Sequence, residues 1–192
     1  IVVHTEGAVE AVDDVDAMAA KVEAAGGSVM APPFDVMTAG RMTVAVDKAG
    51  AVFCMWQAGD NIGSEIVNEP GAFTWAELYT TDPASDPSFY ADLFGYTVTT
   101  DDMGGDFPMT FFQNGDAGFA TVLPIMGPEG TPPHWLPYFA VDDCDASMAQ
   151  IQELGGQVFT GPMDIPPGRF AVVGDPEGAA FAIIALTEVP TE

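Results

Sequence analysis

The chain has 192 residues, 48% of them apolar, which is enough to bury one sizeable core or two small ones. Four Lys and Arg residues face 29 Asp and Glu residues, so the formal net charge is −25. Such a surface repels phosphate backbones and anionic lipids, and we therefore expect no nucleic-acid partner and no membrane partner. No apolar run approaches the roughly 18 residues that a membrane-spanning helix needs.

The acidic surface has two interpretations that the sequence leaves open: a source with high salt, as in a halophile, or an ordinary acidic protein. Cys54 and Cys144 lie among apolar residues without metal-ligand spacing, so we expect core thiols and a reducing cytoplasm. The chain begins without Met and without a recognisable signal peptide, which suggests a fragment or a processed product.

The first 57 residues predict a strand, a helix and three strands. Residues 8–12 form the first strand, Asp13-Asp14 can cap a helix, and the helix carries apolar residues at i, i+3, i+4 and i+7 from Val15. Gly26-Gly27 supplies its C-terminal cap. The strands "SVMAP", "RMTVAV" and "AVFCMW" follow, the last two joined by the turn "DKAG".

The same order of elements recurs twice after a Gly- and Pro-containing linker at residues 58–72. In the middle unit, residues 73–125, the strand "FTWAELYTT" precedes a helix that we expect to be capped by Asp82, with Pro83 at its first position and Gly95 at its end. The third unit, residues 134–186, has Gly155-Gly156 after its helix.

The first and third units are copies of one another. Residues 11–38 align with residues 140–167, and residues 40–56 align with residues 168–184. The shared skeleton is "AVDD-DA", "GG-V", "P-D" and "GR--V--D--GA-F", which is too long and too ordered for chance. The chain is therefore three strand–helix–three-strand (βαβββ) units of α+β class.

This pattern resembles the vicinal-oxygen-chelate superfamily, which includes glyoxalase I, bleomycin-resistance proteins and extradiol dioxygenases. The resemblance lies in "ELYTTDPASDPSFYADLFGY", "HWLPYFAVDDCDA", "GGQV" and "DIPPGRFAVVGDPEGAAF". More narrowly, the chain is similar to tandem-domain actinobacterial glyoxalase-like proteins, which share a joining phrase resembling "WQAGDNIGSEIVNEPGAFTWAEL". The resemblance implies paired βαβββ units whose curved mixed sheets enclose a cup.

By that resemblance, residues 73–192 form a complete glyoxalase-like domain, and residues 1–57 form only the second unit of an incomplete first domain. A lone unit would leave an apolar sheet face and an open edge. We therefore expect two chains to pair through these units as a homodimer; a stable monomer in sedimentation at micromolar concentration would argue against it.

Metal-using relatives place His, Glu or Gln ligands on the first and last strand of each unit. Carried over to this sequence, those positions fall on residues that include no His and no carboxylate: Gly7, Cys54, Trp75, Thr121, Leu136 and Ala182. The sequence therefore predicts no metal and no cofactor, although a divalent metal at a displaced site remains the less favoured alternative.

Two residues are candidates for acid–base chemistry. Glu77 should share a strand face with Trp75 and Tyr79, and a carboxyl among apolar neighbours is either a structural partner or a general base. His134, at the mouth of the third unit's first strand, is either a strand-end residue or an acid–base group that titrates near neutrality.

The remaining candidates would bind a ligand. Arg169 could hold a carboxylate or carbonyl oxygen, but it could equally pair with Asp164, as Arg41 could pair with Asp35 in the other copy. An aromatic cup suits a planar ligand, and about half of the aromatic residues must instead be core. Its expected lining is Trp75, Tyr79, Tyr138 and Phe111.

The interpretation that these observations favour is a metal-free glyoxalase-like protein that binds a small aromatic or carbonyl-bearing molecule in the cup of residues 73–186. One alternative is a lyase, isomerase or hydroxylase-like enzyme that uses Glu77 and His134, of the lyase or oxidoreductase class. A further alternative is a structural protein whose cup is filled by its own side chains.

Overall fold

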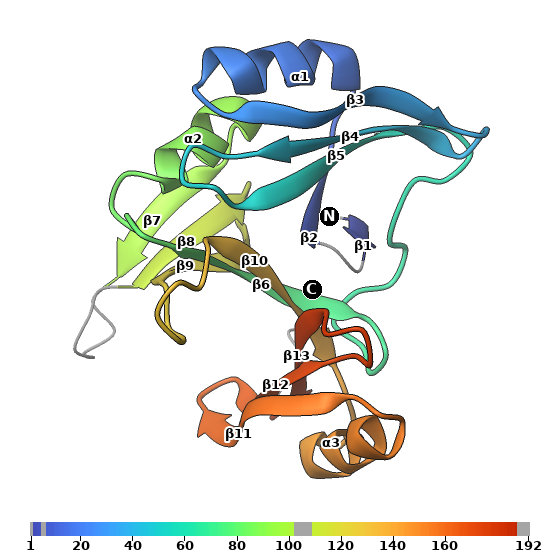
Figure 1. Ribbon diagram of the computed structural model, residues 1–192, viewed down its shortest axis with the longest axis vertical. Helices are drawn as coiled ribbons and strands as arrows, with labels where there is room; N and C mark the ends of the chain where they lie inside the picture. The colour runs from blue at the N-terminus through green and yellow to red at the C-terminus, as the bar shows by residue number, and fades with distance from the viewer. Residues whose placement is uncertain (1, 5–6, 102–108, 188–192) are drawn as a thin grey trace. The chain divides into compact units, whose positions relative to one another are not determined.

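The computed structural model describes residues 2–4, 7–101 and 109–187 (Figure 1). The chain divides into two compact units: Ile1–Ser64 with Ala76–Trp135, and Glu65–Trp75 with Leu136–Glu192. The first unit contains the N-terminal repeat and most of the middle one. The second contains most of the third repeat.

The N-terminal repeat has the expected order of one strand, one helix and three strands. Its elements are β2 (Gly7–Ala11), α1 (Val15–Ala24), β3 (Ser28–Val36), β4 (Gly40–Val46) and β5 (Val52–Ala58), with a short β1 (Val2–His4) before them. The sheet runs β1-β2-β5-β4-β3, with β2 and β5 parallel and the other neighbours antiparallel. Figure 1 shows α1 lying along this sheet beside β3, β4 and β5.

Local sequence explains where α1 begins and ends. The Asp14 carboxylate accepts a hydrogen bond from the amide of Ala17 at 2.9 Å, which satisfies one of the free N–H groups of the first turn. Val15, Met18, Ala19 and Val22 are buried, as the spacing predicted. Gly26 follows the helix at φ 91°, a left-handed conformation that favours glycine.

The middle repeat follows the same order with a shorter helix. Its elements are β6 (Phe73–Thr80), α2 (Pro87–Phe94), β7 (Thr97–Asp101), β8 (Met109–Asn114) and β9 (Ala117–Pro124). Residues Ala76–Thr80 of β6 pair in parallel with β9, and β8 and β7 extend the sheet. Gly95 ends α2 in the left-handed conformation, as expected.

The expected start of this helix was wrong. The helix begins at Pro87 after Asp86, and Asp82 instead accepts a hydrogen bond from the Ser85 amide within a preceding turn. Asp86 is buried, and its carboxylate is satisfied there by a hydrogen bond from the Thr80 hydroxyl. The second of two Asp-Pro pairs therefore starts the helix.

The third repeat repeats the first in register as well as in order. Its elements are β10 (His134–Ala140), α3 (Cys144–Glu153), β11 (Gln157–Ile165), β12 (Gly168–Gly174) and β13 (Ala180–Leu186). Tyr138 of β10 lies opposite Ala182 of β13, just as Val9 of β2 lies opposite Cys54 of β5. Both βαβββ copies predicted from the sequence are confirmed.

The arginine of the repeated Gly-Arg pair forms ion pairs with two aspartates in both copies. Arg41 donates to Asp16 and to Asp35, both at 2.8 Å. In the third repeat, Arg169 donates to Asp145 at 2.7 Å and to Asp164 at 3.0 Å. The pairing that the sequence suggested for each arginine is thus present. In each copy it ties the first turn of the helix to the hairpin that follows.

We expect substitution of Arg41 by Gln to have a small, pH-dependent effect, because this ion-pair network is exposed. The Arg41 guanidinium lowers the pKa of Asp16 by hydrogen bonding, so the stabilisation is present above the ordinary carboxyl pKa and is lost as pH falls through the lowered value. Thermal melts at pH 7 should show a loss of about 1–3 °C. The difference from wild type should shrink at pH 3 and in 1 M salt; an unchanged difference would contradict an electrostatic origin.

The first compact unit has a core built largely of aromatic rings. Phe53 of β5 makes edge contacts with Phe89, Tyr90 and Phe94 of α2, at centroid distances of 5.4–6.2 Å. Phe112 of β8 and Trp135 of β10 also pack against Tyr90. The N-terminal repeat and the middle repeat therefore share one core.

Two buried carboxylates reinforce this core. Asp47 accepts from the amides of Ala49, Gly50 and Ala51, which shapes the turn between β4 and β5, and it also accepts from the Tyr90 hydroxyl at 2.8 Å. Glu10 of β2 is 1% exposed and accepts a hydrogen bond from the Tyr96 hydroxyl.

Candidate functional site

Glu77 and Tyr79 lie two residues apart on β6 and therefore project from the same side of the strand. The Tyr79 hydroxyl donates a hydrogen bond to Glu77 Oε2 at 2.7 Å. Burial and the Glu77 carboxylate both raise the pKa of Tyr79 well above its ordinary value. Tyr79 is thus a neutral phenol that holds one carboxylate oxygen in place.

His134, at the start of β10, stacks on Tyr79. The ring centroids are 5.1 Å apart and the planes are inclined by 14°. The Nδ1 atom of His134 lies 2.8 Å from the carbonyl oxygen of Pro132. Because a carbonyl oxygen can only accept, Nδ1 carries a hydrogen in this contact. Tyr79 thus contacts both residues that the sequence proposed for acid–base chemistry.

Phe111 joins this group through strand register. It lies opposite Thr121 of β9, and Thr121 lies opposite Glu77 of β6, so the three side chains share one sheet face. Phe111 is half-buried on this face, whereas its neighbour Phe112 is fully buried among the aromatic rings of the core. The site face of the first compact unit therefore carries a carboxylate, a phenol, an imidazole and an aromatic ring.

The other predicted ligand-binding residues belong to the second compact unit. These are Trp75, Tyr138, Asp164 and Arg169. Tyr138 is buried and its ring lies 5.9 Å from that of Phe170. Arg169 and Asp164 are engaged with one another, as described above. The cup predicted between residues 73–125 and 134–186 combines segments of both compact units and stays a prediction.

Metal-ligand chemistry does not fit the residues at the family positions. Two of these positions hold polar side chains, the buried thiol of Cys54 and the buried hydroxyl of Thr121. None of the six positions holds an imidazole or a carboxylate: Gly7, Cys54, Trp75, Thr121, Leu136 and Ala182. Within residues 2–4, 7–101 and 109–187, no three His, Cys, Asp or Glu side chains are grouped so that they could hold an ion. We derive no chemical step through a metal.

Sequence reasoning missed the buried polar residues Glu10, Asp47 and Tyr90. A signal for Asp47 was present, because the same Asp recurs at the same turn of the third repeat, where Asp175 accepts from the Ala179 amide. Trp135 lies in the core and donates its indole N–H to the Tyr90 hydroxyl at 2.9 Å.

The fold, with βαβββ repeats in mixed sheets, is that of the vicinal-oxygen-chelate superfamily. The sequence profile of the glyoxalase-like domain family matches residues 75–184, and the chain belongs to this family. It is 43% identical over 175 residues to CFP32 of Mycobacterium tuberculosis, a protein provisionally described as a glyoxylase, covering 91% of this chain and 67% of CFP32.

It is also 38% identical over 178 residues to the anthracycline biosynthesis protein DnrV of Streptomyces peucetius, covering 93% of this chain and 64% of DnrV. The chain thus spans about two thirds of the length of these relatives.

Solved structures agree on the fold. A Mn(II)-bound glyoxalase from Novosphingobium aromaticivorans has a TM-score of 0.62 at 22% identity, over 95% of this chain and 64% of that one. The 2,3-dioxygenase LapB from Pseudomonas sp. KL28 has a TM-score of 0.58 at 14% identity, over 92% and 69% of the two chains. Among the described residues, no helix is long and apolar enough to cross a bilayer.

Proposed function

We propose that this chain binds a small, planar, carbonyl-bearing aromatic molecule, without a metal, on the sheet face that carries Glu77, Tyr79 and Phe111. The observation that carries this proposal is the hydrogen bond from Tyr79 to Glu77 beside the stacked ring of His134. A carboxylate has about four lone-pair sites, so it can accept from a ligand hydroxyl as well as from Tyr79. Aromatic rings offer such a ligand a flat, apolar surface.

The names of two relatives support this ligand class. DnrV of Streptomyces peucetius and DauV of a Streptomyces strain are named as anthracycline biosynthesis proteins, and the latter is 37% identical over 179 residues. Anthracyclines are planar molecules that carry quinone carbonyls and phenolic hydroxyls. A ligand of that kind presents a hydroxyl that can donate to Glu77 and a flat ring surface that can lie against neighbouring aromatic side chains.

Binding of 1,4-dihydroxyanthraquinone, followed by its absorbance and by tryptophan fluorescence, tests the proposal. We expect Glu77→Gln to weaken binding by about 10- to 100-fold, since a hydrogen bond to a charged group contributes roughly 1.5–3 kcal/mol. Tyr79→Phe should weaken binding less, because the ring and the carboxylate both remain. The matched control is Met37→Ala, at a residue 89% exposed on the N-terminal repeat.

Two outcomes would count against the proposal. The first is an equal dissociation constant for wild type, Glu77→Gln and Met37→Ala, which would show that the ligand does not bind on the sheet face that carries Glu77. Loss of binding after treatment with a chelator, with recovery on adding Mn²⁺, would show that the metal-free part of the proposal is wrong.

A second candidate function is proton transfer next to a ligand carbonyl, and it is favoured by one observation: Tyr79 contacts both Glu77 and His134. Glu77 would take the proton from carbon, and a protonated His134 would donate from Nε2 to the carbonyl oxygen, giving an enol. Exchange of that carbon-bound proton in D2O, abolished by Glu77→Gln, would establish this activity. Binding without exchange would leave the first proposal alone.

A further inference from the structure

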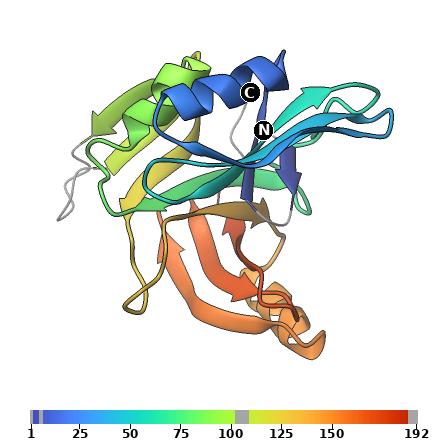
Figure 2. The same ribbon diagram turned by 45° about the horizontal axis from the view of Figure 1, so that its top comes forward.

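A cavity lies within the first compact unit, between α1 and the end of α2. It has a volume of about 300 Å³, at the lower end of the range for small-molecule sites. Helices α1 and α2 lie side by side in both views of the ribbon (Figures 1 and 2). The cavity shares no residue with the site around Glu77. Its lining is Ala11, Val12, Asp13, Asp14, Ala17, Met18, Lys21, Leu93 and Phe94.

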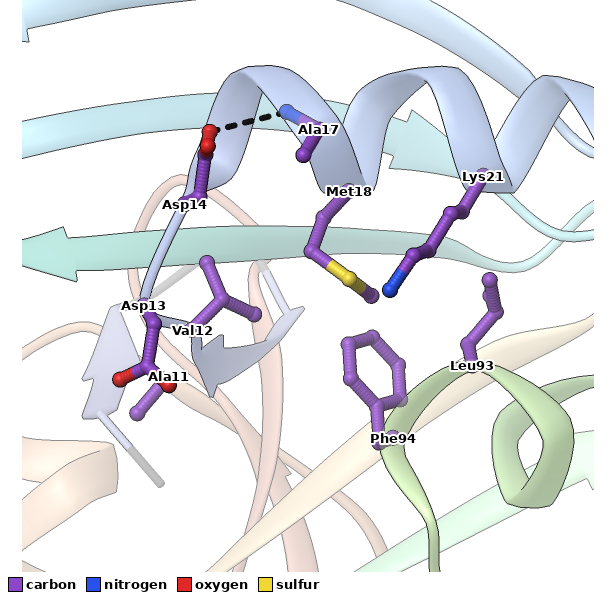
Figure 3. A pocket seen from close by; sticks show the side chains of 9 residues that line it. All are labelled: Ala11, Val12, Asp13, Asp14, Ala17, Met18, Lys21, Leu93 and Phe94. Atoms are coloured by element: carbon purple, nitrogen blue, oxygen red, sulfur yellow. Dashed lines mark hydrogen bonds between the residues drawn. The ribbon is translucent and has the colours of Figure 1, made fainter.

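The lining has an apolar middle and a single cation. Figure 3 shows Met18 and Lys21 reaching from α1 toward Leu93 and Phe94 of α2. The side chains of Val12, Met18, Leu93 and Phe94 give this middle an apolar surface. Lys21 places its ammonium group at one end of that surface.

Lys21 differs from the other three basic residues of the chain. Arg41 and Arg169 are each held by two aspartates, and Lys48 donates to the carbonyl oxygen of Ser85. Within the described residues, no hydrogen bond or ion pair engages the ammonium group of Lys21. In a protein with a net charge of −25, this is a cation with no anion assigned to it.

The acidic residues of the cavity lie at its other end. Asp14 and Lys21 are separated by seven residues of α1, which is about 10 Å at a rise of 1.5 Å per residue. At 0.15 M salt the screening length is about 8 Å, so salt weakens the repulsion between Asp14 and an anion beside Lys21. Asp14 is also occupied as the helix cap.

We propose that this cavity, termed the α1–α2 pocket, binds a small organic anion that has an apolar body and one sulfonate or carboxylate group. The body lies on Met18 and Phe94, and the anionic group pairs with Lys21. The site is separate from the aromatic-ligand site of Glu77 and does not depend on it.

Two fluorescent probes of matched shape test the pocket: 8-anilinonaphthalene-1-sulfonate and the uncharged N-phenyl-1-naphthylamine. At constant 0.15 M salt, wild type should bind the sulfonate more tightly than the neutral probe. We expect Lys21→Gln to weaken sulfonate binding by about 3- to 5-fold, the loss of one exposed ion pair, and to leave the neutral probe unchanged. The matched control is Lys48→Gln, which removes the same charge elsewhere and should change binding less than 2-fold.

A second variant tests whether the probes occupy the volume of the α1–α2 pocket. Ala17→Leu adds three carbon atoms on the exposed surface of α1, and should reduce binding of both probes without unfolding the helix, which circular dichroism checks. Equal effects of Lys21→Gln and Lys48→Gln would overturn the proposal, as would the absence of sulfonate binding in wild type. Glu77→Gln should leave sulfonate binding intact, so the two sites succeed or fail independently.

Discussion

Replacing Tyr90 with phenylalanine should lower the free energy of unfolding by about 2–4 kcal/mol. The Tyr90 hydroxyl donates to Asp47 Oδ2 at 2.8 Å and accepts from Trp135 Nε1 at 2.9 Å, and the side chain is 1% exposed. Its removal leaves a buried carboxylate oxygen and a buried indole N–H without this partner. Each such loss costs about 1–3 kcal/mol, and more for a charged group. Urea unfolding at pH 7 measures the change.

A double-mutant cycle locates the effect in this network. Trp135→Phe removes the donor from the other side, and the double variant Tyr90→Phe/Trp135→Phe should be less destabilised than the sum of the two single variants. An unchanged urea m-value shows that the denatured state is the same. A loss below about 0.5 kcal/mol for Tyr90→Phe, or strict additivity, would contradict a network in which Tyr90 bridges two buried groups.

The same residues show how far the sequence could predict the fold. The order of elements in all three repeats follows from strand alternation, helix spacing and glycine caps, which are local properties. The core that joins the first and middle repeats does not follow from local properties, because the partners of Phe53, Asp47 and Glu10 lie about 40–90 positions away along the chain. Nothing in the neighbourhood of a residue specifies such a partner.

The start of α2 shows a different limit. The stretch "DPASDPS" contains two Asp-Pro pairs four residues apart, and each has the residues of a helix start. Burial decides between them, because Asp86 accepts from Thr80 and Pro87 lies in the core while Asp82 is exposed. Local propensity alone gives both pairs equal weight.

For the candidate site, the sequence identified Glu77, Tyr79 and His134, which the structure brings together, by strand alternation and residue type. The same reasoning applied to "AVEAV" should have identified Glu10, which is likewise a carboxyl among apolar strand residues. What separates the two is the partner: Tyr79 lies two residues from Glu77, whereas Tyr96 reaches Glu10 across the core. The α1–α2 pocket had no signal in the sequence, because it needs two helices from different repeats.

Replacing Glu10 with glutamine should make the protein less sensitive to rising pH. Burial raises the pKa of Glu10 above its ordinary value, against the smaller opposing effect of the Tyr96 hydrogen bond. Between the unfolded pKa of about 4.3 and the raised folded pKa, the native state holds a proton that the unfolded chain has lost. The free energy of unfolding therefore falls as pH rises through this interval, by up to about 1.4 kcal/mol per pH unit.

Glutamine retains a carbonyl oxygen that can accept from Tyr96 but cannot ionise, so this contribution to the slope disappears. Urea unfolding of wild type and Glu10→Gln from pH 4 to pH 8 tests this, because the difference between the two curves cancels the other titrating groups. The difference should move in favour of Glu10→Gln as pH rises and then level off above the folded pKa. A constant difference would mean that Glu10 has the same pKa in the folded and unfolded chain, and a difference that moved the other way would mean that Tyr96 stabilises the carboxylate more than burial destabilises it.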